Sequence, residues 1–343
     1  MPSASLARGA RVVVARDSSD ARRFLEASTA GSIRGDIKEL PARWLYDALG
    51  SRLYEAVTRL PQYYLPRREA EILRGRSAEI AARTRARTLV ELGAGAAANT
   101  RLLLDALHTL ERFVALDVSE QALRGSASAI AVEYPRLDVR AIVGDFDRDL
   151  ALLPPHRPRL VAFLGSTIGN LYPAERERLL ATLAGAFAAG DALLLGVDLV
   201  KDVARLERAY NDGSGVTEAF ARNALVAVNR ELDATFDQRR FVYSAQWDAE
   251  HEWMDVGFRA RGAQTVSIRR LGVDLDFEDG EPLRIEISAK FRRARFELEA
   301  ARAGLGVDAW WTDRANDFAV ALLRAVEPHR SGEEPDVSRR AHL

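Results

Sequence analysis

The stretch that decides the fold is Thr88-Leu89-Val90-Glu91-Leu92-Gly93-Ala94-Gly95, an apolar run that ends in a glycine turn. The run has the length and composition of a buried strand, and a helical stretch follows it from Thr100 to Leu110. Glycine at such a turn lets the chain bend sharply and lets a ligand approach the backbone closely. We therefore predict a strand, a tight turn and a helix at the start of an α/β sheet.

Four further runs have the composition of strands that are buried on both faces, at residues 113–116, 139–143, 160–164 and 192–197. Helical stretches at 120–134 and 173–189 lie between them. Strands that alternate with helices are typical of a parallel sheet covered by helices on both faces. The central third of the chain therefore predicts a doubly wound α/β fold.

The pattern changes after about residue 200. Residues 202–233 read as helical with an interruption at 211–215, and residues 241–291 read as antiparallel strands with a turn at 279–282. We expect two domains and a tail, divided as follows: a sheet domain of 68–198 plus 291–327, a discontinuous α+β domain of 15–67 plus 199–290, and a mobile tail at 328–343.

The composition excludes several classes of function. The 343 residues include no cysteine, which excludes disulfides, thiolate nucleophiles and cysteine-ligated metal clusters. Five scattered histidines show no metal-ligand spacing, so we expect no metal site. A formal net charge of −1 gives no electrostatic reason to expect nucleic acid or an anionic membrane as a partner. No apolar run approaches the ~20 residues that span a bilayer, so we expect a cytoplasmic protein with a small-molecule substrate; the sequence leaves the oligomeric state open, with a monomer as the default.

Acidic residues follow the second and third predicted strands. Asp117 comes directly after the second strand, where a carboxylate can accept hydrogen bonds from ribose hydroxyls. Asp145 and Phe146 follow the third, where an acid can accept from an adenine amino group and a ring can pack on the base. This pattern fits a nucleoside carrier without a pyrophosphate, such as S-adenosylmethionine, whose sulfonium is favoured by negative charge.

The glycine turn by itself leaves a nicotinamide- or flavin-dependent enzyme as an alternative. The dinucleotide fingerprint has a third glycine, which falls at position 98 of this chain, and that residue is alanine. Alanine is a tolerated variant there, so the alternative stays open. Each acid alone also fits an ordinary solvated loop.

Several long and unusual motifs are shared with a known family. They are Phe163-Leu164-Gly165-Ser166-Thr167-Ile168-Gly169-Asn170-Leu171, Asp198-Leu199-Val200-Lys201-Asp202, Arg208-Ala209-Tyr210, Trp44-Leu45-Tyr46-Asp47, Leu60-Pro61-Gln62-Tyr63-Tyr64 and Trp310-Trp311-Thr312-Asp313. The chain resembles the histidine-specific Nα-methyltransferases of ergothioneine biosynthesis over nearly its whole length. The resemblance implies a Rossmann-like class I methyltransferase sheet with a substrate-binding domain. It also implies three methyl transfers from S-adenosylmethionine to histidine, which give the betaine hercynine.

The resemblance also implies roles for individual residues. The methyl donor would be held by four of them, Gly93, Asp117, Asp145 and Phe146. The backbone end of the amino acid would be bound by Tyr63, Asn170 and Tyr210, with Tyr46 close to the amine, so that Tyr46 and Asn170 lie nearest the chemistry. Glu286 and Ser288 would bind the imidazole ring.

Two positions depart from the family pattern. Asn99 stands where the family often has a lysine that contacts the methionine part of the donor. We therefore expect this donor contact to be weakened or replaced. Val256 stands where the family has a larger methionine in the side-chain pocket, which leaves room for a bulkier ring. Because of Val256, an Nα-methyltransferase for another aromatic amino acid remains an alternative. Because of Asn99, a non-catalytic protein that only binds the donor remains a second alternative.

The residue pattern can be compared with these implied roles. Glu286 and Ser288 lie two residues apart on a predicted strand, so their side chains share one face. There they can form hydrogen bonds with the two ring nitrogens. Polar residues on the solvent-exposed face of any half-buried strand alternate in the same way. Asn170 follows the fourth strand, where a neutral amide can bind a zwitterion or simply form a turn. Tyrosine faces attract a quaternary ammonium by ~0.5–2 kcal/mol, although a single tyrosine is more often a core residue. For the reaction we expect in-line displacement by the free amine, whose proton passes to solvent or to a tyrosine hydroxyl.

Overall fold

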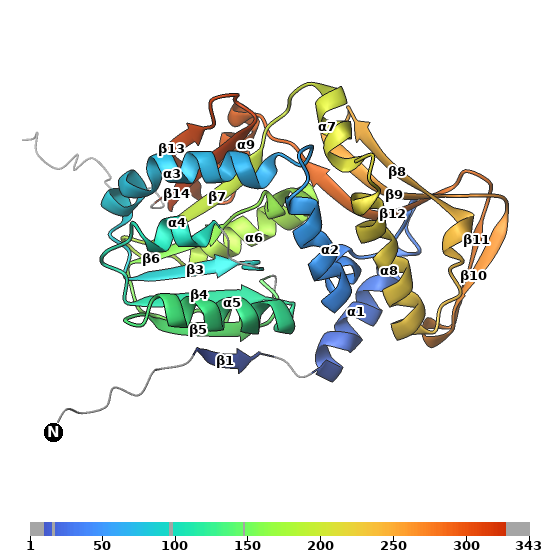
Figure 1. The fold of residues 1–343 in the computed structure, drawn as a ribbon, viewed down its shortest axis with the longest axis horizontal. Helices are drawn as coiled ribbons and strands as arrows, with labels where there is room; N and C mark the ends of the chain where they lie inside the picture. Colours follow the sequence, from blue (N-terminus) through green and yellow to red (C-terminus); the bar gives the residue numbers. More distant parts are fainter. Residues whose placement is uncertain (1–9, 16–17, 96–98, 147, 327–343) are drawn as a thin grey trace, which may run out of the picture.

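A computed structural model of the chain describes residues 10–15, 18–95, 99–146 and 148–326. Figure 1 shows a large sheet with its helices on the left, and smaller sheets with α1 (Ser18–Ser32), α2 (Ala48–Thr58) and α8 (Val216–Leu232) on the right. The predicted mobile tail and position 98 lie outside the described residues.

The large sheet has eight strands in the order β1-β5-β4-β3-β6-β7-β14-β13. The strands are β1 (Arg11–Val14), β3 (Thr88–Leu92), β4 (Arg112–Asp117), β5 (Asp138–Val143), β6 (Arg159–Phe163), β7 (Ala192–Asp198), β13 (Leu305–Thr312) and β14 (Phe318–Ala325). The first six in this order are parallel, and β14 is antiparallel to both of its neighbours. All five strands that the sequence predicted are confirmed.

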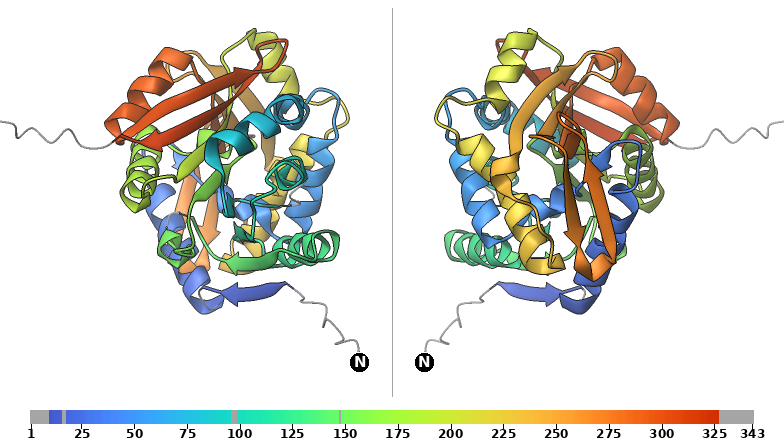
Figure 2. Two further views of the ribbon diagram at one scale, coloured as in Figure 1. Left: turned by 90° about the vertical axis from the view of Figure 1, so that its left-hand side faces the viewer. Right: turned by 90° about the vertical axis from the view of Figure 1, so that its right-hand side faces the viewer.

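Helices cover both faces of this sheet. One face packs against α3 (Leu65–Thr84), α4 (Thr100–Leu104) and α5 (Glu120–Glu133), and the other against α6 (Pro173–Ala186) and α9 (Arg293–Arg302). Successive strand residues join opposite cores, as Leu89 and Val90 do in β3. The left-hand view of Figure 2 shows the strands between these two helix layers. The predicted doubly wound fold is confirmed.

The structure corrects one predicted helix and adds one strand at each edge of the large sheet. The helix predicted from Thr100 to Leu110 ends at Leu104, because tighter turns carry the chain toward β4 and the Thr109 hydroxyl donates to the Ala86 carbonyl at 2.8 Å. Strands β1 and β13 were not predicted. β1 has only four residues, and the tryptophans of β13 were noted in the sequence only as part of a family motif.

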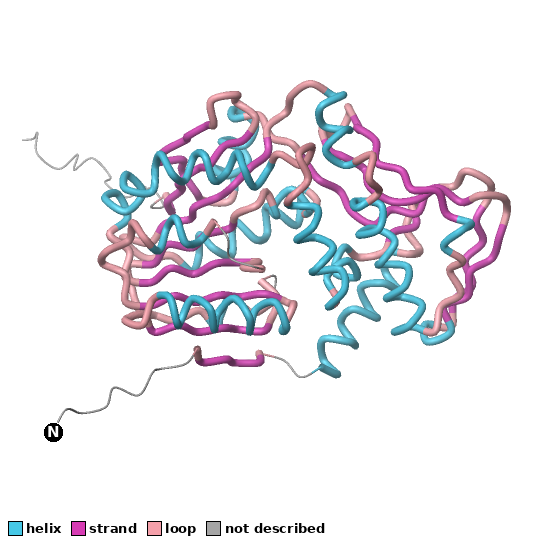
Figure 3. The backbone as a smooth tube through the Cα atoms, viewed as in Figure 1, coloured by secondary structure: helices cyan, strands magenta, loops and turns pink. Residues whose placement is uncertain are grey.

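The second group of elements packs beside the carboxyl ends of the large sheet. It contains a four-stranded sheet in the order β2-β12-β9-β8 and a hairpin of β10 and β11. Its strands are β2 (Lys38–Glu39), β8 (Phe241–Asp248), β9 (Trp253–Ala260), β10 (Gln264–Ile268), β11 (Val273–Phe277) and β12 (Pro282–Ala289). Figure 3 shows helices α1, α2, α7 (Val203–Tyr210) and α8 around these strands. The predicted helical break at 211–215 is confirmed, whereas the exact division into two domains stays a prediction.

The order of the strands determines where a ligand can bind. The chain proceeds from β3 outward to β4 and β5, and then crosses to β6 and β7 on the other side. Ligands of open α/β sheets bind at such a switch point, beside the carboxyl ends of the strands. After β6 the chain forms the short helix η3 (Thr167–Asn170), and strand β12 of the second sheet packs directly on η3.

The contact between η3 and β12 depends on a glycine. A Cβ atom added at Gly169 would lie 2.8 Å from the Ala289 carbonyl oxygen, which is closer than real Cβ atoms approach. We expect Gly169→Ala to lower the free energy of unfolding by about 1–3 kcal/mol, as overpacking does. The measurement is denaturant unfolding.

Gly185→Ala is the matched control for this change. Gly185 lies in α6, and an added Cβ would meet nothing within 4 Å. Alanine there should stabilise the helix by about 0.5–1 kcal/mol. If Gly169→Ala and Gly185→Ala had the same free energy of unfolding, the close packing of η3 on β12 would be contradicted.

Candidate active site

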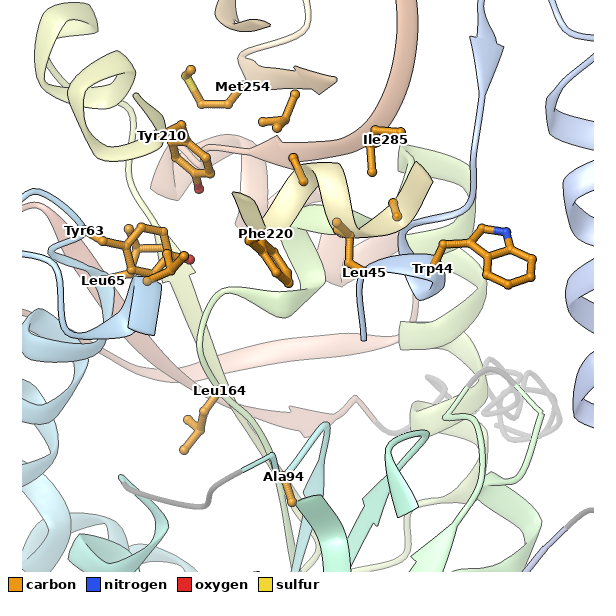
Figure 4. Close-up of a cluster of buried hydrophobic side chains, with 14 of the residues drawn as sticks. Trp44, Leu45, Tyr63, Leu65, Ala94, Leu164, Tyr210, Phe220, Met254 and Ile285 are labelled. Carbon is orange, nitrogen blue, oxygen red and sulfur yellow. The ribbon is translucent and has the colours of Figure 1, made fainter. Parts of the chain in front are cut away.

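A pocket opens where the second group of elements meets the carboxyl end of β6. It encloses about 630 Å³ of space, including open solvent at its mouth. All seven residues predicted to contact the amino acid line it: Tyr46, Tyr63, Asn170, Tyr210, Val256, Glu286 and Ser288. Figure 4 shows Tyr63, Tyr210 and Phe220 close together although they come from three separate segments. The fold therefore gathers residues that are 242 positions apart, from 46 to 288.

Strand β12 supplies the polar wall of the pocket. Glu286 and Ser288 share one face of the strand, and the Asn170 amide donates to the Glu286 carboxylate at 2.6 Å. Burial raises the pKa of Glu286 to about 7, although the Lys290 ammonium lowers it in part. On the neighbouring strand, Val256 lies directly opposite Glu286. Glu286 and Ser288 therefore stand where they can form hydrogen bonds with a polar ring in the pocket.

Aromatic side chains form the opposite wall. Ring centroids lie 5.8 Å apart for Tyr46 and Tyr54, 6.5 Å for Tyr54 and Tyr63, and 5.9 Å for Tyr63 and Tyr210. Phe220 completes the wall, 5.6 Å from Tyr46. Rings in this arrangement can present their faces to an ammonium group.

Sequence reasoning missed two members of this aromatic wall. Both Tyr54 and Phe220 line the pocket. Tyr54 lies on helix α2 and Phe220 on helix α8, where an aromatic residue on an apolar helix face has the same pattern as an ordinary core residue. No signal in one sequence would have separated them from the core.

Burial has a chemical consequence for the tyrosines. It raises the pKa of both Tyr46 and Tyr63 well above the ordinary value, and the nearby Glu286 carboxylate adds to the effect. Their hydroxyl groups therefore stay protonated near neutral pH. They can donate hydrogen bonds, but they are poor proton acceptors.

The predicted donor-binding residues lie along the carboxyl ends of β3, β4 and β5. Gly93 has a φ of +70°, a left-handed conformation that favours glycine. The Asp117 carboxylate accepts from the backbone N–H groups of Gly95 and Ser119, each at 2.8 Å. These contacts place Asp117 beside the glycine turn.

Asp145 and Phe146 occupy the neighbouring loop after β5. Asp145 is buried and forms an ion pair with Arg43, which comes from the short helix η1 (Ala42–Tyr46). Phe146 packs on Phe163 with ring centroids 5.0 Å apart. The carboxylate predicted to accept from adenine is therefore also in contact with the helix that carries Tyr46.

The structure shows what Asn99 contacts. Its amide nitrogen donates to the Glu69 carboxylate at 2.8 Å and to the Pro66 carbonyl at 3.3 Å. Glu69 also accepts from the Gly165 N–H at 2.7 Å, so it connects α3 to the end of β6. Sequence reasoning missed Glu69, because an acid within the charged helix α3 has the pattern of a solvated face.

Three acidic groups, Glu69, Glu91 and Asp117, gather on the side of the site where the donor is predicted to bind. Burial raises the pKa of Glu69 to about 7 and that of Glu91 to about 8, and it also raises the pKa of Asp117. Their hydrogen-bond donors are neutral groups, such as the Thr100 hydroxyl at 2.6 Å from Glu91. A nearby sulfonium would favour the ionised form of these acids, whereas a pyrophosphate would be repelled by each acid that ionises, which disfavours the nicotinamide alternative.

The described residues were also searched for a metal site and for a membrane-spanning helix. Within the described residues, no group of histidine and acidic side chains could hold a metal ion. None of the helices in the described part of the chain is long and apolar enough to span a bilayer.

The strand order, the glycine turn and the acid beside that turn are those of a Rossmann-like methyltransferase sheet. A family model described as "Histidine-specific methyltransferase, SAM-dependent" matches residues 20–325. The chain belongs to this family, and S-adenosylmethionine is its methyl donor. The family assignment made from the sequence motifs is thereby confirmed.

Individual relatives agree with the family assignment. The chain is 49% identical to the histidine N-alpha-methyltransferase of Mycolicibacterium smegmatis over 306 residues, covering 86% of this chain and 95% of the relative. It is also 49% identical to the enzyme of the same name from Mycobacterium tuberculosis, covering 83% and 90% of the two chains. A more distant relative, the L-tryptophan methyltransferase of Psilocybe serbica, is 25% identical and covers 84% and 88%.

Glu91 should make stability depend on pH. Because its pKa is raised from 4.5 to about 8, the protonated group stabilises the fold, and this contribution is lost as pH rises through about 8. Glu91→Gln cannot ionise and can still accept from Thr100. We expect the variant to gain about 1–3 kcal/mol of unfolding free energy at about pH 9 and little at about pH 5.

The matched control is Glu133→Gln. Glu133 is exposed, and its hydrogen bonds with Arg101 lower the pKa of this carboxyl group. This variant should show no gain at high pH. Equal stability of Glu91→Gln and the unmodified protein at both pH values would contradict the assigned ionisation of Glu91.

Proposed function

We propose that the enzyme methylates the α-amine of free L-histidine three times and thereby forms hercynine. The observation that carries this proposal is the hydrogen bond of 2.6 Å between Asn170 and Glu286 inside the pocket. It joins a residue suited to the amino-acid backbone to a residue suited to the imidazole ring. The two mycobacterial relatives, which are named for histidine, support the same substrate.

The hydrogen bond also orients Asn170 toward the substrate. Its amide nitrogen is used by Glu286, so its amide oxygen remains available to accept a hydrogen bond from the substrate amine. Tyr63 and Tyr210 would donate to the substrate carboxylate, and Glu286 and Ser288 would bind the ring. A neutral amide binds the amine without adding charge, so a permanently cationic product can still dissociate.

Gly93, Asp117, Asp145 and Phe146 would hold S-adenosylmethionine, which supplies an electrophilic methyl group. The uncharged substrate amine attacks the methyl carbon, so that an N–C bond forms while the C–S bond breaks and its electrons remain on sulfur. The amine loses its proton to solvent. The raised pKa values of Tyr46 and Tyr63 argue against a tyrosine as the base. The chain contributes alignment and exclusion of water, which can lower a barrier by several kcal/mol.

Each methyl transfer increases the demand for an aromatic environment. A trimethylated amine carries a fixed charge and no N–H group. The ring faces of Tyr46, Tyr54 and Phe220 can stabilise that charge by ~0.5–2 kcal/mol without a carboxylate. The aromatic wall therefore suits the product as well as the substrate.

Glu286→Gln tests the assignment of the ring-binding residue. Removal of the charge should raise the KM for histidine about tenfold or more, because a charged hydrogen bond is lost in a buried site. The affinity for S-adenosylhomocysteine, measured by calorimetry, should stay within about twofold. Glu278→Gln, an exposed position before the same strand, is the control and should leave both constants unchanged. An unaltered histidine KM in Glu286→Gln would remove Glu286 from the site.

A panel of free amino acids tests the substrate against the aromatic alternative. We expect histidine to have the highest kcat/KM, because Glu286 lies opposite Val256 where the ring would bind. Val256→Met should lower any turnover of tryptophan or tyrosine by about tenfold, since methionine is longer and fills about one methylene volume more of the pocket. Turnover of tryptophan or tyrosine without histidine would show the alternative to be correct. Donor binding with no turnover of any amino acid would identify a binding protein instead.

A further inference from the structure

Strand β12 and the residue after it place a third polar side chain on the face that carries Glu286 and Ser288. Lys290 follows Ser288 by two positions, and its side chain has no exposed surface. It does not line the pocket itself but lies directly behind two residues that do. Nothing in the sequence reasoning assigned Lys290 a role.

The Lys290 ammonium makes three polar contacts. It donates to the Tyr210 hydroxyl at 2.8 Å, to the Ser288 hydroxyl at 2.9 Å and to the Asp198 carboxylate at 2.9 Å. An ammonium has three N–H donors and no acceptor. All three donors are therefore used, and both hydroxyl oxygens must accept from Lys290.

Asp198 holds the ammonium in place and keeps it charged. Its carboxylate also accepts from the Tyr64 hydroxyl at 2.9 Å and pairs with Lys201. Burial alone would lower the pKa of Lys290, but Asp198 outweighs this and raises it. The pKa of Asp198 is lowered despite burial, because both lysines lie beside it.

The direction of the two hydroxyl hydrogens of Tyr210 and Ser288 follows from the hydrogen bonds around them. The oxygens of Tyr210 and Ser288 are 2.8 Å apart, so one of their two hydrogens lies between them. The other hydrogen cannot point toward Lys290, which only donates. Both residues line the pocket, so the remaining hydrogen points into it.

We propose that Lys290 is a positioning residue that makes the Tyr210–Ser288 pair present a single hydroxyl donor to the amino-acid substrate. The group that receives it is an acceptor, either a substrate carboxylate oxygen when Tyr210 donates or an unprotonated ring nitrogen when Ser288 donates. The inference rests on the proposed function for the identity of the substrate. Without Lys290, each hydroxyl hydrogen can turn toward the vacated position, and the pocket loses its fixed donor.

Lys290→Met and its double-mutant cycle test this role. We expect the KM for histidine to rise about tenfold, since a fixed hydrogen bond is lost, with kcat changed less. In a Tyr210→Phe/Ser288→Ala background the same substitution should change KM by no more than about twofold. An equal loss in both backgrounds would mean that Lys290 acts through the fold and not through the hydroxyl pair, and would overturn the proposal.

Lys201→Met is the matched control. Lys201 pairs with the same Asp198 carboxylate and contacts Tyr64, and none of its hydrogen bonds reaches Tyr210 or Ser288. Its loss should leave the histidine KM within about twofold. If Lys201→Met raised KM as much as Lys290→Met, charge balance at Asp198 would explain both effects, and the proposal would fail.

A measurement on the unmodified protein covers the case in which Lys290→Met does not fold. The chain has only three lysines, Lys38, Lys201 and Lys290, so lysine labelled with ¹⁵N at Nζ gives three signals. Arginine substitutions at Lys38 and Lys201 assign them. Saturating histidine should shift the Lys290 signal, and S-adenosylhomocysteine alone should not.

The outcomes separate the two proposals. If histidine is bound and methylated but the Lys290 signal does not move, the positioning role is wrong and the proposed function stands. If histidine is neither bound nor methylated, the proposed function fails. The cycle is then repeated with whichever amino acid the panel identifies, and additive losses there would overturn the positioning role as well.

Discussion

The buried ion pair between Asp198 and Lys290 is the contact on which the site depends. Asp198 ends the interior strand β7 of the large sheet, and Lys290 follows strand β12 of the small one. The pair therefore joins the two sheets where neither side chain meets water. Removing one partner from such a pair typically costs about 3–5 kcal/mol, because the other charge stays buried. The pocket lies directly beside this joint, and its polar residues take their positions from it.

The two sides of the proposed site differ in their electrostatic character. The proposed donor side gathers Glu69, Glu91 and Asp117 with neutral hydrogen-bond partners, so a bound sulfonium would favour their ionised forms. The amine side has tyrosine rings and an amide, which tolerate a cation without holding it tightly. Methyl transfer moves positive charge from the first environment to the second. The arrangement is consistent with directional transfer followed by release of both products.

Prediction from the sequence succeeded where a signal is local and failed where it is not. Strand β3 and its glycine turn were predicted because apolar runs and turn residues describe their own conformation. Phe220 was missed, because an aromatic residue on a helix face looks the same whether it meets a core or a pocket. Glu69 was missed for a similar reason, since only the packing of α3 on β6 shows that this acid is buried.

The sequence by itself determined the fold class and the family, because these follow from short-range patterns and from long motifs. Only the tertiary structure decided which side chains share a pocket and in which carboxyl groups burial raises the pKa. These properties depend on burial and on contacts between segments such as η3 and β12, which lie more than 100 residues apart. A single sequence carries no record of such distances, whereas the pKa of Glu286 and the orientation of Asn170 follow from them directly.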